Sequence, residues 1–370
     1  MVTKGNWTGN TRAGGETMKR EYQGQTNRNP LLRKESGQVV VLTAISLVVL
    51  CGMAALAIDL GHAVVVRQEL QNAADASALA GAGNLFPDGP DWVRAEGSAS
   101  GSISWNKSDG QSLSDCQVQC GYWNLDKTPP GLQSQSIVPG PRDVPAVMVT
   151  VQRTDGKNGG PMPTSFANVL GISNIPLHAQ AVAVVSSPAT VKPGTLFPVA
   201  ISQEAAKDFE IYKDTDHLVT IGSPYHYGDG LAGQWTTFLD DFNDVTRLRE
   251  LIPDGNPEAI GTTTTGDCSI PNTCIWIQSG VEATLYANPN EESVSKYVGE
   301  VVVLPVVGDV LLEATHEMAP VVGFVGFYIV SATGGNTKTI TGYFVSDFTV
   351  QGSSGGGPSY GALTPPHLVQ

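Results

Sequence analysis

The sequence predicts an α+β protein: a long N-terminal transmembrane helix that continues into a stalk, followed by β-rich extracytoplasmic domains, the outer one sandwich-like. Three observations carry this prediction. Residues 39–58 contain no charged side chain, and the residues after them keep a helical pattern without a proline until Pro87. The 370-residue chain also holds 42 glycines and 24 prolines with only 15% charged residues, which favours strands and turns over helix bundles.

Residues 1–36 are expected to form a disordered, basic tail in the cytoplasm, because they are polar, glycine-rich and short of apolar side chains. Residues 1–38 hold seven of the 21 Lys and Arg residues and three of the 35 Asp and Glu residues, which gives a net charge of +4. The rest of the chain holds 14 basic and 32 acidic residues and therefore has a net charge of −18. Basic residues before a membrane span stay in the cytoplasm, so the acidic bulk is expected outside. A net-negative exported domain also argues against nucleic-acid binding.

The apolar run from Val39 to Ile58 has the length of one membrane crossing. At 1.5 Å rise per residue, a helix of twenty residues spans about 30 Å, the thickness of a bilayer hydrocarbon core. A cleaved signal peptide is the alternative, but its apolar region is typically about 7–15 residues long. The longer run here leads straight into a helical pattern, which favours an uncleaved anchor.

After Asp59, small and apolar residues recur every three or four positions, which predicts a helical stalk with one packing face as far as residue 83. The small side chains would let another helix or a sheet approach closely. Asp59 and Arg67, near the exit from the bilayer, are interpreted as ordinary interfacial polarity. The residues expected to pack are Gly61, Leu70, Ala73, Ser77 and Ala80.

The segment GQVVVLTAISLVVLCGMAALAIDLGHAVVVRQELQNAADASALAGA closely resembles the N-terminal segment of TadE/TadG-like proteins of Flp (tight-adherence) pilus assembly. Those proteins have a Gly-Gln entry, a membrane helix ending in Ala-Ile-Asp-x-Gly, and an Ala-rich run that Leu70 to Ala82 match here. Prepilin peptidases cut after a Gly that precedes the apolar run, usually with Glu five residues later. Gly37 meets the first requirement, but Leu42 stands at the second position, so processing stays open.

Residues 84–187 are expected to form a pilin-like α+β region, with a weaker likeness to the same family as far as residue 187. Alternating apolar residues predict strands at 116–123 and 144–153, the second with Val147, Val149 and Val151 on one face. An exposed loop at 126–143 lies between them. A short helix capped by Thr164 or Ser165 and ended by Gly171 precedes a strand at 175–185.

Residues 188–194 are expected to be a linker, residues 195–351 a β-rich extracytoplasmic domain, and residues 352–370 a flexible tail. Apolar runs between turn residues favour a sandwich, with a helical piece near 236–252. The predicted strands are 196–201, 217–222, 274–278, 297–307, 324–333 and 339–350.

Four of the five cysteines fall in two close pairs, Cys116 with Cys120 and Cys268 with Cys274, and each pair is expected to form a local disulfide. Zinc is the alternative, but the pairs are far apart in sequence and in different predicted domains. Cys51 lies inside the apolar run and is interpreted as a small apolar filler.

The sequence offers no catalytic motif. The histidines are scattered, His316-Glu317 lacks the second histidine of an H-E-x-x-H helix, the segment GSPYHYG at 222–228 contains no G-x-S-x-G elbow, and no Walker-type phosphate-binding loop is present. No catalytic residue, metal site or cofactor is therefore expected. The carboxylates of Asp240, Asp241 and Asp244 leave a calcium site open, although they do not follow the EF-hand order.

The resemblance implies a non-enzymatic, single-pass membrane component of Flp-type pilus assembly or anchoring, with its N-terminus in the cytoplasm of a bacterium. Its expected partners are membrane lipid and other pilus-assembly proteins or pilin, with no small-molecule substrate. Two alternatives remain: an exported envelope or surface protein that uses this anchor without a role in pilus formation, and an exported hydrolase or metal-binding module.

Overall fold

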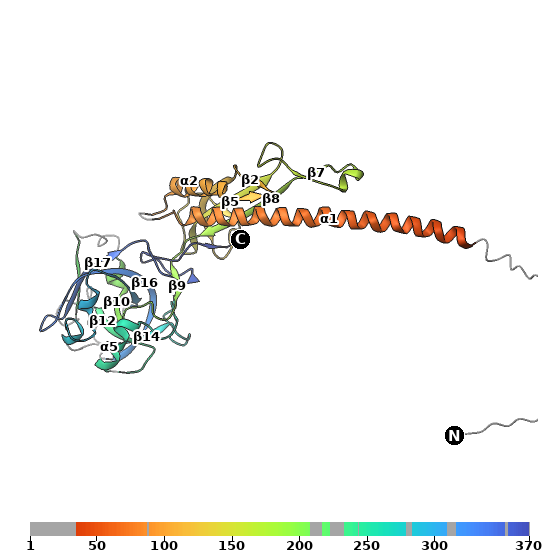
Figure 1. The fold of residues 1–370 in the computed structure, drawn as a ribbon. Coiled ribbons are helices and arrows are strands. Elements are labelled where there is room, and N and C mark those ends of the chain that lie inside the picture. Colours follow the sequence, from red (N-terminus) through yellow and green to blue (C-terminus); the bar gives the residue numbers. More distant parts are fainter. Residues whose placement is uncertain are drawn as a thin grey trace, which may run out of the picture. The chain divides into compact units, whose positions relative to one another are not determined.

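The computed structural model describes residues 35–86, 89–207, 217–222, 233–242, 244–278, 283–308, 316–351 and 354–369. The tail expected at 1–36 lies almost wholly outside these residues. The chain divides into two units, residues 1–57 and 58–370, and each is described by itself. One helix, α1 (Glu35–Ala82), runs through the boundary without a break (Figure 1).

Within the first unit, α1 is long and apolar enough to cross a membrane, as predicted. Its large apolar side chains are largely exposed, from 49% for Leu56 to 71% for Val48, so the protein itself does not cover this stretch. A membrane-spanning helix presents such a surface to lipid.

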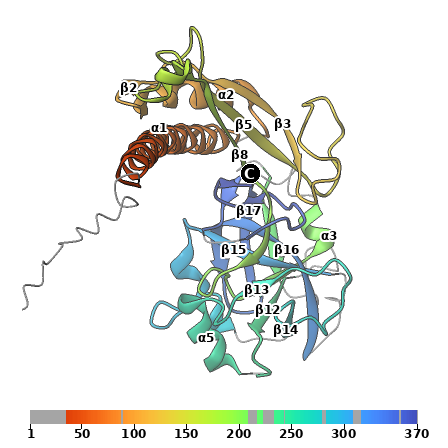
Figure 2. The same ribbon diagram turned by 90° about the vertical axis from the view of Figure 1, so that its right-hand side faces the viewer.

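In the second unit, the rest of α1 and a second helix, α2 (Trp92–Ser102), pack on one face of an antiparallel sheet (Figure 2). The sheet has the strand order β21–β8–β5–β3–β4, and we call it with its two helices the sheet lobe. Val147, Val149 and Val151 are fully buried beneath the helices, as their alternation predicted. Its strands are β3 (Gln117–Asn124), β4 (Leu132–Gln133), β5 (Asp143–Arg153), β8 (Leu177–Val184) and β21 (His367–Leu368).

Small residues bring α1, α2 and the sheet together. A methyl group on Gly81 would lie 2.9 Å from Cγ1 of Val147 and 3.0 Å from the carbonyl oxygen of Ala95, so the helices meet at backbone distance. The hydroxyl of Ser102 on α2 donates a 3.1 Å hydrogen bond to the hydroxyl of Ser77 on α1. The sequence did not predict α2, because its Gly and Ser content is typical of a loop; the residues that α2 buries are Ala95, Ala99 and Ser102.

Two small hairpins project from the sheet lobe. One consists of β1 (Lys107–Ser108) and β2 (Gln111–Ser112), after the short 3-10 helix η2 (Ile103–Trp105). The other consists of β6 (Met162–Pro163) and β7 (Asn174–Ile175), with the 3-10 helix η3 (Ala167–Leu170) at its tip. Figure 1 shows the second hairpin extending along α1.

The outer β domain closes into a barrel instead of the expected sandwich. Strand β15 pairs with β10 in parallel and with β16 antiparallel, which joins the two ends of the sheet β16–β14–β12–β10–β15. We call this domain the barrel lobe; β17 and β11 extend it beyond β16. Its strands are β10 (Val199–Ser202), β11 (Val219–Gly222), β12 (Gly233–Phe238), β14 (Cys274–Gln278), β15 (Val301–Val307), β16 (His316–Thr333) and β17 (Thr339–Val345).

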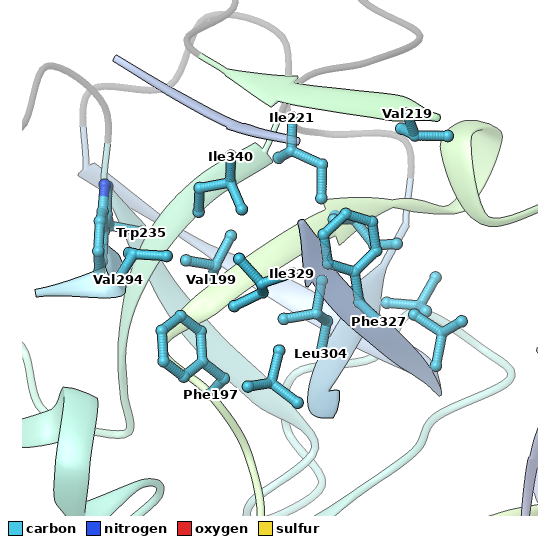
Figure 3. Packing of buried hydrophobic residues seen from close by; sticks show 14 of the residues in the cluster. Phe197, Val199, Val219, Ile221, Trp235, Val294, Leu304, Phe327, Ile329 and Ile340 are labelled. Carbon is cyan, nitrogen blue, oxygen red and sulfur yellow. The ribbon is translucent and has the colours of Figure 1, made fainter. Parts of the chain in front are cut away.

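Closure depends on the long strand β16, whose successive parts pair with β14, β15 and β17. A methyl group on Gly323 would overlap the ring of Tyr360, and one on Gly326 would lie 3.1 Å from the Phe348 side chain. Glycines at such positions allow a strand to bend tightly beneath other groups. Apolar side chains from six of the strands converge in the core, among them Val199, Leu304, Phe327 and Ile340 (Figure 3).

The segment expected to be a linker and the tail expected to be flexible both contain strands. Strand β9 (Pro188–Val191) pairs with β13 (Ile260–Gly261) and with β19 (Ser354–Gly355). The tail also supplies β20 (Ala362–Leu363), which pairs with β18 (Phe348–Thr349), and β21. A methyl group on Gly357 would lie 2.0 Å from the carbonyl oxygen of Pro188, so glycine here permits close backbone contact.

The helical piece expected at 236–252 begins only at Val245. Thr236 to Phe238 belong to β12, because β-branched and aromatic residues suit a strand. Asp244 then caps α5 (Val245–Asp254) by accepting a 2.9 Å hydrogen bond from the backbone N–H of Thr246. The remaining short helices are α3 (Gln203–Lys207), η5 (Ala283–Leu285) and η6 (Val294–Tyr297).

Replacing Ala73 by Leu tests whether the packing face of α1 is filled. Ala73 is fully buried, so we expect the larger side chain to destabilise the sheet lobe by about 1–3 kcal/mol. Ala76, one turn away on the exposed side, is the matched control and should tolerate Leu with little change. Chemical unfolding of the full chain in detergent measures both; equal stability of the two variants would contradict the packing described.

Candidate functional site at the exit of the apolar helix

Asp59 is the first charged residue after the apolar run, and it is only 4% exposed. Its carboxylate accepts hydrogen bonds from three consecutive backbone N–H groups: Ser165 and Phe166 at 2.9 Å, and Ala167 at 2.5 Å. Hydrogen bonds to an ionised acceptor are stronger than neutral ones. One side chain of α1 therefore holds the tip of the β6–β7 hairpin.

The tip is shaped to present these three N–H groups. They precede or begin η3, where a helix has N–H groups without partners inside it. The segment is closed by hydrogen bonds from Thr164 to Ser173 and from the Thr164 hydroxyl to Ile172. Gly171 ends η3 with a φ of 84°, which glycine adopts without strain, as the sequence predicted for this position. We call residues 164–173 the tip loop.

The stem of the hairpin also contacts α1. Met162 is fully buried and packs with Ala63 and Val66 of the helix. Asp59, Ala63 and Val66 are spaced by four and three residues, so they lie on one helical face. The tip loop is thus fixed to α1 by polar contacts at Asp59 and by apolar contacts one and two turns further on.

A second hairpin is held by His62 and Glu69 of α1. Nε2 of His62 lies 2.9 Å from Oδ1 of Asp109, and Glu69 accepts a 2.6 Å hydrogen bond from the backbone N–H of Asp109. The other carboxylate oxygen of Asp109 accepts from Arg153 at 3.1 Å. Burial raises the pKa of Asp109, but the hydrogen bonds from His62 and Arg153 outweigh it and hold that pKa below its usual value.

Gln71 completes the set by donating a 3.0 Å hydrogen bond to the carbonyl oxygen of Gln180 in β8. Four polar side chains of α1 therefore bind three segments of the sheet lobe: the tip loop, the β1–β2 turn and strand β8. We call these four the tether residues: Asp59, His62, Glu69 and Gln71.

The five stalk residues that were predicted to pack differ in how deeply they are buried. Leu70, Ala73 and Ser77 are fully buried in the sheet lobe, and Ala80 is half-buried. Gly61 is exposed. The packing face of α1 is thus occupied, within the second unit, by the chain's own sheet and by α2.

Sequence reasoning missed the role of Asp59, while Arg67 is exposed, in line with interfacial polarity. One signal could have revealed Asp59. Successive steps of four, three and four residues lead from Leu70 through Val66 and Ala63 to Asp59, so a carboxylate stands on the predicted packing face. A charge on such a face needs a partner from the segment that covers it.

Of the two expected disulfides, Cys268–Cys274 is present, and Cys116 and Cys120 are free thiols. Cys120 lies in β3 and Cys116 directly precedes it, and residues four apart in an extended chain are about 13 Å apart. A disulfide needs Cα atoms within about 7 Å. Burial, aided by the charge of Glu96, raises the pKa of the Cys120 thiol to about 11, so it is protonated at neutral pH.

The three carboxylates considered for calcium have separate partners. Asp240 pairs with Arg247 at 2.6 Å, Asp241 with His316 at 2.7 Å, and Asp244 caps α5. Across the described residues, no group of three His, Cys, Asp or Glu side chains is arranged to hold a metal ion.

Comparison with known protein families gives a match for the N-terminal part of the chain. Residues 37–84 match the family model Tad, described as "Putative Flp pilus-assembly TadE/G-like". The matched residues begin two residues before the apolar run and end two residues after α1, so they include all four tether residues. The N-terminal module is therefore TadE/G-like, which confirms the resemblance seen in the sequence. A search of the curated proteins found no match, and neither did a search of the solved structures.

Replacing Asp59 by Ala should release the tip loop. Loss of a hydrogen bond to a charged group costs about 1.5–3 kcal/mol, so we expect the amides of Ser165, Phe166 and Ala167 to exchange with solvent at least about tenfold faster. Asp75→Ala is the control, because Asp75 accepts a hydrogen bond from Gln71 within α1. Hydrogen exchange with mass spectrometry reports both; unchanged protection of the tip loop in the Asp59 variant would refute the tether.

Proposed function

We propose that this chain, whose residues 37–84 form a TadE/G-like module, is a single-pass membrane component of Flp-type pilus assembly or anchoring. One observation carries the proposal: the matched residues coincide with a helix that is apolar enough to cross a membrane and that then forms part of a folded core. The role is mechanical and structural, and it uses the helix and the exported lobes for protein contacts.

The arrangement of α1 supports an anchoring role. Its apolar run and its docked part belong to one helix without a proline, and Asp59 follows the last apolar residue of the run directly. No linker separates the anchor from the first hydrogen-bonded contact of the sheet lobe. A force on the exported part would therefore act on the helix through the tether residues and the buried face.

We propose an orientation with the N-terminus in the cytoplasm. The net charge of +4 in residues 1–38 favours it, because basic residues before a span are retained on that side. The disulfide between Cys268 and Cys274 agrees, since disulfides persist in oxidising compartments outside the cytoplasm.

Partner contacts are expected on surfaces other than the buried face of α1. That face is filled by Leu70, Ala73, Ala74 and Ala78 against the chain's own sheet. Pilin or other assembly proteins would bind the barrel lobe or the exposed side of the helix. The alternative is an envelope protein that uses the same anchor without a role in pilus formation. This alternative is supported by the extent of the family match, which covers residues 37–84 and not the lobes that follow.

A crosslinking pull-down from native membranes tests the proposal, with a tag on the C-terminus of the full chain. We expect enrichment of pilin, the inner-membrane platform or the secretin over an unrelated single-pass protein that carries the same tag. Recovery of the intact chain without any of them would contradict a role in pilus assembly and favour the independent envelope protein.

A further inference from the structure

The tip loop exposes large apolar side chains. Phe166 is 44% exposed, Val169 88%, Leu170 70% and Ile172 50%. No charged residue occurs between Lys157 and His178, so the whole hairpin that carries the loop is uncharged. A contiguous exposed apolar patch marks a surface that contacts another molecule or a membrane.

The patch lies at a defined level of α1. The tip loop is hydrogen-bonded to Asp59, the first residue after the apolar run. Beyond Asp59 the helix still exposes Leu60 at 66%, Val64 at 61% and Val65 at 56%. The first exposed charge on the helix is Arg67. Exposed apolar surface therefore continues past Asp59, on the helix and on the loop bonded to it.

We propose that the tip loop inserts into the outer interfacial layer of the bilayer, where Phe166, Val169, Leu170 and Ile172 contact lipid. Continuity with the apolar run identifies lipid as the occupant, because α1 exposes no Asp, Glu, Lys or Arg side chain between that run and Arg67, and the β6–β7 hairpin has none. Val65 lies about 9 Å further along the helix than Asp59. Interfacial segments bury their apolar faces about 5–10 Å into the boundary between headgroups and acyl chains.

At this depth in the bilayer, the hydrogen bonds of Asp59 offset the cost of placing its carboxylate next to lipid. A carboxylate that faces lipid is costly unless it is paired or hydrogen-bonded. Backbone N–H groups in an apolar layer likewise need internal acceptors. The carboxylate and the three N–H groups of the tip loop satisfy one another, and the side chains that the loop then exposes are four large apolar ones and the uncharged Ser165, Asn168 and Ser173.

A loop beside the helix would add a second point of membrane contact. A single helix can rotate about its axis in a bilayer, and its tilt is set by packing and by interfacial anchors. The tip loop stands to one side of α1, so its insertion would restrict rotation and tilt. This inference needs only the membrane span, and it holds for either function considered above.

Spin labels on the full chain in vesicles of phosphatidylcholine and phosphatidylglycerol test the proposal. Cys51, Cys116 and Cys120 are first replaced by Ala, and the Cys268–Cys274 disulfide is kept. A label is placed at Leu170→Cys or, as the matched control, at Val138→Cys. Val138 is 94% exposed and precedes β5, whose far end leads to the β6–β7 hairpin.

We expect collisions of the Leu170 label with a water-soluble nickel complex to be at least about threefold fewer than at Val138, since polar solutes avoid the apolar layer. Collisions with oxygen should remain frequent. Equal exposure of both labels to nickel would overturn the proposal, and so would a Leu170 label shielded from both reagents, which indicates a protein contact. Val169→Cys provides an independent second site if the Leu170 variant does not fold.

Discussion

The burial of one face of α1 against strands β5 and β8 is the contact on which the rest of the protein depends. Val147, Val149 and Val151 share one core with Leu70, Ala73, Ala74 and Ala78 of α1 and with Ala95 and Ala99 of α2, which packs on the same face. Leu70 alone, when fully buried, contributes about 1.5–3 kcal/mol. Because the same helix carries the apolar run, the core of the sheet lobe includes the continuation of that run.

The tether residues follow the apolar run of α1 and connect the helix to the sheet lobe through hydrogen bonds. Their acceptors and donors are backbone groups of the tip loop, of Asp109 and of β8, together with the carboxylate of Asp109. Backbone groups keep their place when side chains vary, so such contacts fix the position of α1 along the sheet. In the proposed membrane setting, they also remove the cost of placing Asp59 next to lipid.

Local patterns predicted much of this structure. The apolar run, the alternation in β5 and the Gly171 stop each depend on one short segment, and each was predicted from the sequence. Barrel closure was not predicted, because it depends on which strands β15 and β16 pair with, and alternation says nothing about pairing. The sheet contacts of the tail were missed because a glycine-rich sequence is typical both of a flexible segment and of one whose backbone packs closely against another strand. Asp59 was missed for a related reason: its partners are backbone groups 106 to 108 residues away.

The most direct test of the account compares two truncated chains in mild detergent, one with residues 58–370 and one with residues 84–370. If α1 is part of the core, the longer chain should unfold cooperatively and protect the amides of β5 and β8 from exchange. The shorter chain should lose that protection, because it leaves the valine face of β5 uncovered. Equal protection of β5 and β8 in both chains would contradict the claim that residues 58–82 of α1 belong to the folded core of the sheet lobe.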